Sequence, residues 1–183
     1  MTEHVRSKAD VMKGINDLAL HGEIVIFGST YMANFPFYEL INKCELEHAI
    51  YNRSIEGLTL AQAGEILEDC VLSIHPSKVF LAFGEEDAGD PSALTEYQSI
   101  VERIRTALPA CKVYLILLPL QGEGVQFNEA LRSLCDGKHV MGIPFAPSPL
   151  SDTALYRSRF KELCRFFRSK PIGLAEAFAV AEL

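Results

Sequence analysis

Two hydroxyl side chains follow directly on a short apolar segment of the sequence. Residues Ile24 to Phe27 are apolar, Gly28 ends the run, and Ser29 and Thr30 come next. A strand that ends in a glycine turn and presents a hydroxyl there is one way in which hydrolases hold a nucleophile. Such a nucleophile needs a base that takes its proton and donors that stabilise the developing oxyanion. The residue types therefore raise the possibility of acyl transfer, and other segments have to supply these two functions.

Three adjacent carboxyl side chains, Glu85, Glu86 and Asp87, follow another apolar run, and Asp90 is close to them. Mutual repulsion could keep one of these carboxyls protonated, so that it donates a hydrogen bond. A hard cation such as Mg²⁺ or Ca²⁺ could also bind these oxygens, although the spacing fits no EF-hand loop. The structural interpretation is a solvated acidic loop. We predict no metal site here and no cofactor.

The elements that position these residues alternate along the chain. Apolar runs rich in Val, Ile and Phe predict strands, and apolar side chains three or four residues apart between them, as in Ile100, Ile104 and Leu108, predict helices. Asp90 and Pro91 fit the start of the helix that contains Ile100. The strands are predicted over 23–28, 48–51, 78–83, 112–118 and 138–143.

Further helices are expected at the two ends of this core. One covers about 7–21, with Ser7 and Asp10 spaced as a capping box and Gly22 as its stop. A second runs from about Asp152 to Arg168, and a short one covers about 172–183. No repeat or linker divides the chain, so we predict a single domain over 1–183.

Strands that alternate with helices predict a parallel sheet with helices on both faces. Such strands are buried on both sides, which explains why they read as continuous apolar runs. Ligands bind beyond the carboxyl ends of strands in sheets of this kind. The segments that follow the strands are therefore the ones in which a site is expected.

Composition narrows the class of protein. The 183 residues are 49% apolar and 22% charged, which is typical of a globular domain. The longest apolar stretch, Val113 to Leu120, is far shorter than the ~20 residues that span a bilayer, and the polar N-terminus shows no secretory signal. A net charge of −7 makes nucleic acid an unexpected partner. The five scattered cysteines favour reduced thiols in the cytoplasm over a disulfide framework.

Three segments together resemble the SGNH, or GDSL, hydrolases, a superfamily of lipases and esterases. "VIFGST" resembles the family's first block, "YNRSIEGLT" its second and "VFLAFGEED" its third, in the family's order and each after a predicted strand. The resemblance covers nearly the whole chain. It implies a three-layer α/β/α sandwich with a flavodoxin-like, five-stranded parallel sheet.

The resemblance also implies roles for single residues. Thr30 falls on the position of the nucleophilic serine, with Ser29 where aspartate is usual. Gly57 falls on the oxyanion glycine, and Glu86 occupies the place of the oxyanion asparagine. By the same resemblance, Ser29, Asn52, Arg53, Gly84 and Asp87 are candidates for ligand binding. Arg53 could bind a carboxylate or phosphate of a ligand, or pair with Glu56 or another carboxylate of these loops.

The sequence departs most from the family pattern at the last block, Asp-x-x-His. Asp152 fits its aspartate, but Leu155 replaces the histidine. Leucine cannot carry a proton, and an ionised glutamate at 86 accepts hydrogen bonds where asparagine donates them. Of the histidines, His48, His75 and His139 fall at the amino ends of strands, and His4 and His21 belong to the N-terminal helix and its exit. His4 is the least constrained, because the N-terminus could fold across the site or reach that of a neighbouring subunit.

Two hypotheses follow from these departures. In the first, the chain is a pseudoenzyme whose cleft binds a small ligand or partner without turnover. In the second, it hydrolyses acyl or acetyl esters with Thr30 as nucleophile and a non-standard base. Both predict a small-molecule ligand or ester substrate and no nucleic-acid or membrane partner, and a homo-oligomer is compatible with either.

Overall fold

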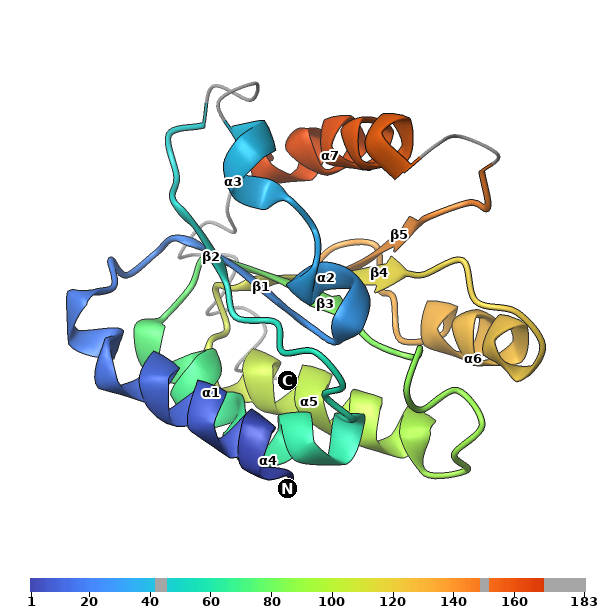
Figure 1. Ribbon diagram of the computed structural model, residues 1–183, viewed down its shortest axis with the longest axis horizontal. Coiled ribbons are helices and arrows are strands. Elements are labelled where there is room, and N and C mark those ends of the chain that lie inside the picture. Colours follow the sequence, from blue (N-terminus) through green and yellow to red (C-terminus); the bar gives the residue numbers. More distant parts are fainter. Residues whose placement is uncertain (42–45, 149–151, 170–183) are drawn as a thin grey trace.

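A five-stranded parallel sheet forms the centre of the computed structural model, which describes residues 1–41, 46–148 and 152–169 (Figure 1). The strand order is β2-β1-β3-β4-β5, and every neighbouring pair is parallel. The predicted fold class is therefore confirmed. The strands are β1 (Ile24–Gly28), β2 (Ile50–Asn52), β3 (Lys78–Ala82), β4 (Lys112–Leu117) and β5 (Val140–Pro144).

Helices cover both faces of the sheet, which makes three layers (Figure 1). On one face, α1, α4, α5 and α6 enclose one apolar cluster; on the other, α2, α3 and α7 enclose a second. The helices are α1 (Glu3–Gly14), α2 (Thr30–Ala33), α3 (Phe37–Leu40), α4 (Leu60–Cys70), α5 (Ala93–Ala107), α6 (Glu123–Arg132) and α7 (Asp152–Phe167), with 3-10 turns η1 (Asn16–Leu18) and η3 (Leu72–Ile74).

Alternate side chains of each strand enter different clusters. In β1, Val25 and Phe27 face the α4–α5 side, whereas Ile24 and Ile26 face the α7 side. Every residue of β1 and β3 is buried. The continuous apolar runs in the sequence thus have the expected cause, since both faces of these central strands are covered.

The N-terminal helix differs from the prediction. It begins at Glu3, and the Thr2 hydroxyl caps it by accepting from the Val5 N–H at 3.4 Å, so the predicted Ser7–Asp10 capping box is wrong. The helix already ends at Gly14, and Gly22 instead turns the chain into β1 with a φ of +82°. The helix thus begins and ends earlier than predicted. The predicted helix at about 172–183 lies outside the described residues.

The start of α5 also differs from the prediction. The helix begins at Ala93, so Asp90 is not its N-cap residue. The Asp90 carboxylate instead accepts from the N–H and the hydroxyl of Ser92, each at 2.8 Å, and so shapes the turn that leads into the helix.

The cysteines divide into two groups. Cys70, Cys111 and Cys135 are free, and burial raises the thiol pKa of Cys70 and of Cys111 to about 12. Cys164 is disulfide-bonded, so the expectation of reduced thiols is wrong for this residue. Spacing along the chain does not reveal which thiols meet in space.

None of the described helices is long and apolar enough to cross a membrane.

Candidate active site

The Thr30 hydroxyl lies at the carboxyl end of the central strand β1 and is held from two sides. It donates a hydrogen bond to Oε1 of Glu86 at 2.7 Å and accepts one from the Gly57 N–H at 3.0 Å. The three residues come from three different segments, each of which follows a strand. The structure therefore brings together Thr30, Gly57 and Glu86, which the family resemblance had singled out.

Close contact between β1 and β3 sets the position of Thr30. Gly28 is in register with Ala82, and a Cβ on Gly28 would overlap the Ala82 carbonyl oxygen. The Ser29 N–H donates to that same carbonyl at 3.1 Å. The chain turns here, and Thr30 becomes the first residue of α2.

Gly57 is held by the loop between β2 and α4. The N–H groups of Arg53 and Ile55 donate to the carbonyls of Ile26 and Gly28, which extends the pairing with β1 beyond the strand. Gly57 has a φ of +71°, a conformation that favours glycine. A capping box of Thr59 and Gln62 then starts α4. Together, these features of the loop direct the Gly57 N–H at the Thr30 oxygen.

The three carboxylates after β3 have different structural roles. Glu85 accepts from the Tyr31 N–H at 2.7 Å, Glu86 accepts from Thr30, and Asp87 accepts from the Leu60 N–H at 3.0 Å. Burial is the main reason why the pKa values of Glu85 and Asp87 are raised. Only Glu86 is exposed. The interpretation as a solvated loop is thus wrong for Glu85 and Asp87, and the described residues contain no cluster suited to a metal ion.

We expect the Glu85→Gln variant to gain stability relative to the wild type as the pH rises from about 4 to 7. The raised pKa means that folded Glu85 holds its proton more tightly than unfolded Glu85 does. Its stabilising contribution is complete below the unfolded pKa and is lost as the pH rises through the folded pKa. Glutamine carries no such proton and still offers an oxygen to the Tyr31 N–H. Urea unfolding at several pH values measures the difference.

Exposed Glu65 on α4 provides the control for this experiment. The Glu65→Gln variant should differ from the wild type by a nearly constant amount over the same range. A constant difference for Glu85→Gln as well would contradict the assignment.

The position at which the family resemblance expects a base lies at the start of α7. The rings of Tyr31 and Tyr156 are 6.4 Å apart, so the first turns of α7 and of α2 are neighbours. Leu155 is half-buried there, and Asp152 is exposed at the first position of the helix. The Asp152 side chain forms no hydrogen bond or ion pair with the described residues. Hydrocarbon therefore occupies the place in which the family resemblance expects an imidazole.

No imidazole of the described chain bonds to the Thr30 hydroxyl. His48 pairs with Glu23 at 3.3 Å, and His139 lies 3.7 Å from Asp136, both at the amino ends of strands. The rings of His21 and His75 are 5.0 Å apart, just before β1 and β3. His4 is exposed on α1.

Ser29 and Gly84 serve the backbone around Thr30. The Ser29 side chain is fully buried, and its hydroxyl has no hydrogen-bond partner among the described residues. Gly84 has a φ of +123°, and a Cβ there would clash with Phe127. Neither residue offers a side-chain group to the Thr30 hydroxyl. If Ser29 and Gly84 bind a ligand as predicted, they would do so through backbone atoms alone.

Asn52 and Arg53 turn away from the Thr30 hydroxyl. The Asn52 amide donates to the Met32 carbonyl at 2.9 Å, which ties β2 to α2. Arg53 crosses to α1, where its Nη1 donates to the Met12 carbonyl at 3.1 Å and to the Asn16 side-chain oxygen at 2.9 Å. The predicted pairing of Arg53 with Glu56 is wrong, because Arg53 forms no ion pair with any described carboxylate.

One feature beside Thr30 was not predicted. Arg159 of α7 lies 4.5 Å above the ring of Phe145, and its charge lowers the pKa of Tyr31, which burial raises more strongly. Tyr31, Phe145 and Tyr156 thus form an aromatic wall next to the Thr30 loop. Tyr31 directly follows Thr30 in the sequence, but the other two rings come from distant segments that no local pattern places beside it.

Solved structures share this fold. A protein from Streptococcus pneumonia, described as a platelet activating factor, is 18% identical with a TM-score of 0.79, and the alignment covers 90% of this chain and 93% of that one. A GDSL-like lipase from Bacteroides thetaiotaomicron is 12% identical with a TM-score of 0.68, covering 86% and 97%. A lipase/acylhydrolase from Enterococcus faecalis is 16% identical with a TM-score of 0.64, covering 82% and 97%.

The sequence itself matches no family model and no curated protein. At identities this low, the structural likeness establishes a common fold only. The chemistry of the site has to be argued from the residues that this chain has there.

Proposed function

We propose that this chain, which has the α/β/α fold of the SGNH/GDSL hydrolases, binds a small ligand at the Thr30 site without hydrolysing it. The hydrogen bond from the Thr30 hydroxyl to the Glu86 carboxylate carries this proposal. By resemblance, an SGNH-type hydrolase has a hydrogen-bond donor at the position of Glu86, and this donor stabilises the oxyanion.

The charge at Glu86 opposes ester cleavage. An ionised carboxylate only accepts hydrogen bonds, and a second negative charge forming beside it would be repelled. The loss of a single oxyanion donor lowers the rate by about 10²–10³ in other hydrolases. The Gly57 N–H, the remaining donor of this pair, already bonds to the Thr30 oxygen. Attack by Thr30 therefore lacks the stabilisation that acyl transfer requires.

The same geometry favours ligands that donate hydrogen bonds. Glu86 is exposed, and its second carboxylate oxygen has no partner among the described residues. A hydroxyl or ammonium group could donate to it, and the half-buried rings of Tyr31 and Tyr156 could contact an apolar part of the ligand. We propose a polyol or an amine as the ligand class.

The Thr30–Glu86 bond also favours a second candidate, a slow esterase. Glu86 is placed to take the Thr30 proton, so it could act as the non-standard base. A carboxylate is a weaker base than an imidazole, with an ordinary pKa of about 4.3 against about 6.5. Such an enzyme would be far slower than a hydrolase with a histidine.

Hydrolysis of p-nitrophenyl acetate and butyrate decides between the two candidates. We expect the wild type and Thr30→Ala to show equal rates, both at the level of Thr106→Ala, which changes an exposed threonine of α5. Turnover that Thr30→Ala abolishes and Thr106→Ala preserves would refute binding without turnover. Loss of that turnover in Glu86→Gln would then identify Glu86 as the base.

A further inference from the structure

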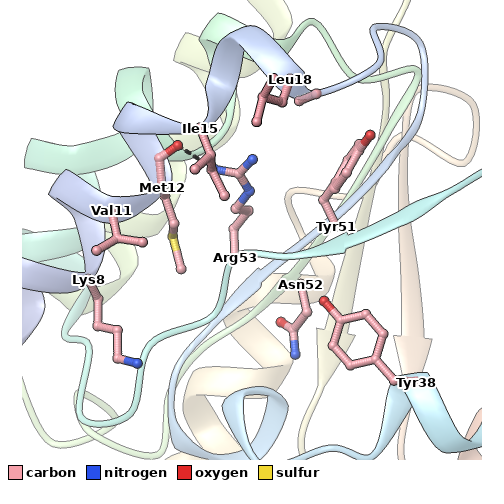
Figure 2. A pocket seen from close by; sticks show the side chains of 10 residues that line it. Lys8, Val11, Met12, Ile15, Leu18, Tyr38, Tyr51, Asn52 and Arg53 are labelled. Atoms are coloured by element: carbon pink, nitrogen blue, oxygen red, sulfur yellow. Dashed lines mark hydrogen bonds between the residues drawn. The ribbon is translucent and has the colours of Figure 1, made fainter.

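A pocket lies away from Thr30, between the N-terminal segment and the edge strand β2. Its volume is about 410 Å³, within the range of small-molecule sites. Figure 2 shows α1 side chains along one side and Tyr51 and Asn52 of β2 across from them. Its apolar wall consists of Val11, Met12, Ile15, Leu18, Tyr38 and Tyr51.

Much of this apolar wall is open to water. Val11 is 60% exposed, Leu18 78% and Tyr38 73%. Together with Ile15 and Leu20, they make up most of the large apolar side chains that the described surface exposes. A cluster of exposed apolar side chains of this kind often marks a binding surface.

Arg53 forms the polar part of the pocket. The residue is only 4% exposed, and its guanidinium lies between the α1 side chains and Tyr51 (Figure 2). Both of its hydrogen bonds use Nη1 and go to neutral oxygens, those of Met12 and Asn16. No described residue accepts from Nε or Nη2. A buried cation is normally paired with an anion, and here that anion is missing from the described chain.

The charge of the lining is one-sided. Among the described residues that line the pocket, Lys8 is the other ionisable one apart from Arg53 and the tyrosines, and none is an aspartate or a glutamate. The whole chain carries a net charge of −7. Burial lowers the pKa of Arg53, which is the expected result of a cation held without a counter-charge.

We infer that this pocket binds a small organic anion, a carboxylate attached to an aliphatic or aromatic body. The carboxylate accepts hydrogen bonds from the free nitrogens of Arg53, and the body lies against the apolar wall. Lys8 at the other end of the row of α1 side chains adds attraction for the negative charge. This site is separate from the Thr30 site, and it does not depend on the function proposed for Thr30.

Calorimetric titration with 4-phenylbutyrate tests the inference, with neutral 4-phenylbutyramide as the matched probe. We expect saturable binding of one carboxylate per chain and at least about tenfold weaker binding of the amide. Arg53→Met should weaken binding of the carboxylate by about tenfold or more, since it removes the charged donors. Amide proton and nitrogen shifts should change at residues 8–19 and 51–53.

Two further variants keep the test decisive. Arg53 also anchors α1, so Arg53→Met could unfold; Lys8→Glu changes an exposed side chain and should weaken binding by about threefold or more. Lys161→Glu makes the same change on α7, across the sheet, and should leave binding unchanged. Equal affinity for acid and amide, no saturable binding, or shifts centred on Thr30 and Gly57 would each overturn the inference.

Discussion

The triple variant Thr30→Ser, Glu86→Asn, Leu155→His should hydrolyse p-nitrophenyl acetate with a kcat/KM at least about 10³-fold above that of the wild type. By resemblance, two groups of an SGNH-type hydrolase are replaced in this chain, the proton carrier by Leu155 and the oxyanion donor by Glu86. Each is worth about two orders of magnitude or more elsewhere. Restoring both should produce a large gain.

Each substitution acts on a stated feature of the site. Asparagine at 86 removes the carboxylate to which the Thr30 hydroxyl donates and supplies an N–H donor in its place. Serine at 30 removes the methyl group that restricts the side-chain rotation of threonine. Histidine at 155 enters the first turn of α7, three residues after Asp152, which could orient the imidazole.

The control for this experiment carries Leu155→Gln instead of Leu155→His, with the other two changes kept. Glutamine is polar but takes no proton at neutral pH, so the control should be at least about 10²-fold slower than the triple variant. Circular dichroism and thermal unfolding establish that both variants are folded. A folded triple variant that is as slow as its control would show that the aligned positions do not meet in one site.

Gly28→Ala should lower the free energy of unfolding by about 3 kcal/mol or more. An added Cβ would overlap the Ala82 carbonyl oxygen, which is backbone of the adjacent central strand and already accepts from Ser29. β1 and β3 would have to separate where both are fully buried. Urea unfolding followed by far-ultraviolet circular dichroism measures the loss.

Gly64→Ala is the matched substitution. Gly64 lies inside α4, where a Cβ would meet only Arg103 Nη1 at 3.8 Å. This variant should gain about 0.5–1 kcal/mol, because alanine favours the helix over glycine. If Gly28→Ala is as stable as the wild type, the close approach of β1 and β3 is not what requires a glycine there.

Most of the fold was predictable from the sequence because it depends on patterns that repeat along the chain. The apolar runs that became β1 and β3 are buried on both faces, so few other structures could accommodate them. Element ends were harder to predict, because Thr2 and Ser7 are both of residue types that cap helices; the helix that Thr2 caps buries Val5 and Ala9 in the core.

The sequence by itself determined the chemical types at the Thr30 site: a hydroxyl at 30, a carboxylate at 86 and hydrocarbon at 155. Only the tertiary structure decided which of them touch. Thr30 and Glu86 are 56 residues apart along the chain, and parallel pairing of β1 with β3 places them at one edge of the sheet. Arg53 shows the same limit, because its neighbours Met12 and Asn16 come from a helix whose position no local pattern specifies. Contacts between distant segments depend on how the layers assemble, and that is why the partner of each polar side chain could be found only in the folded chain.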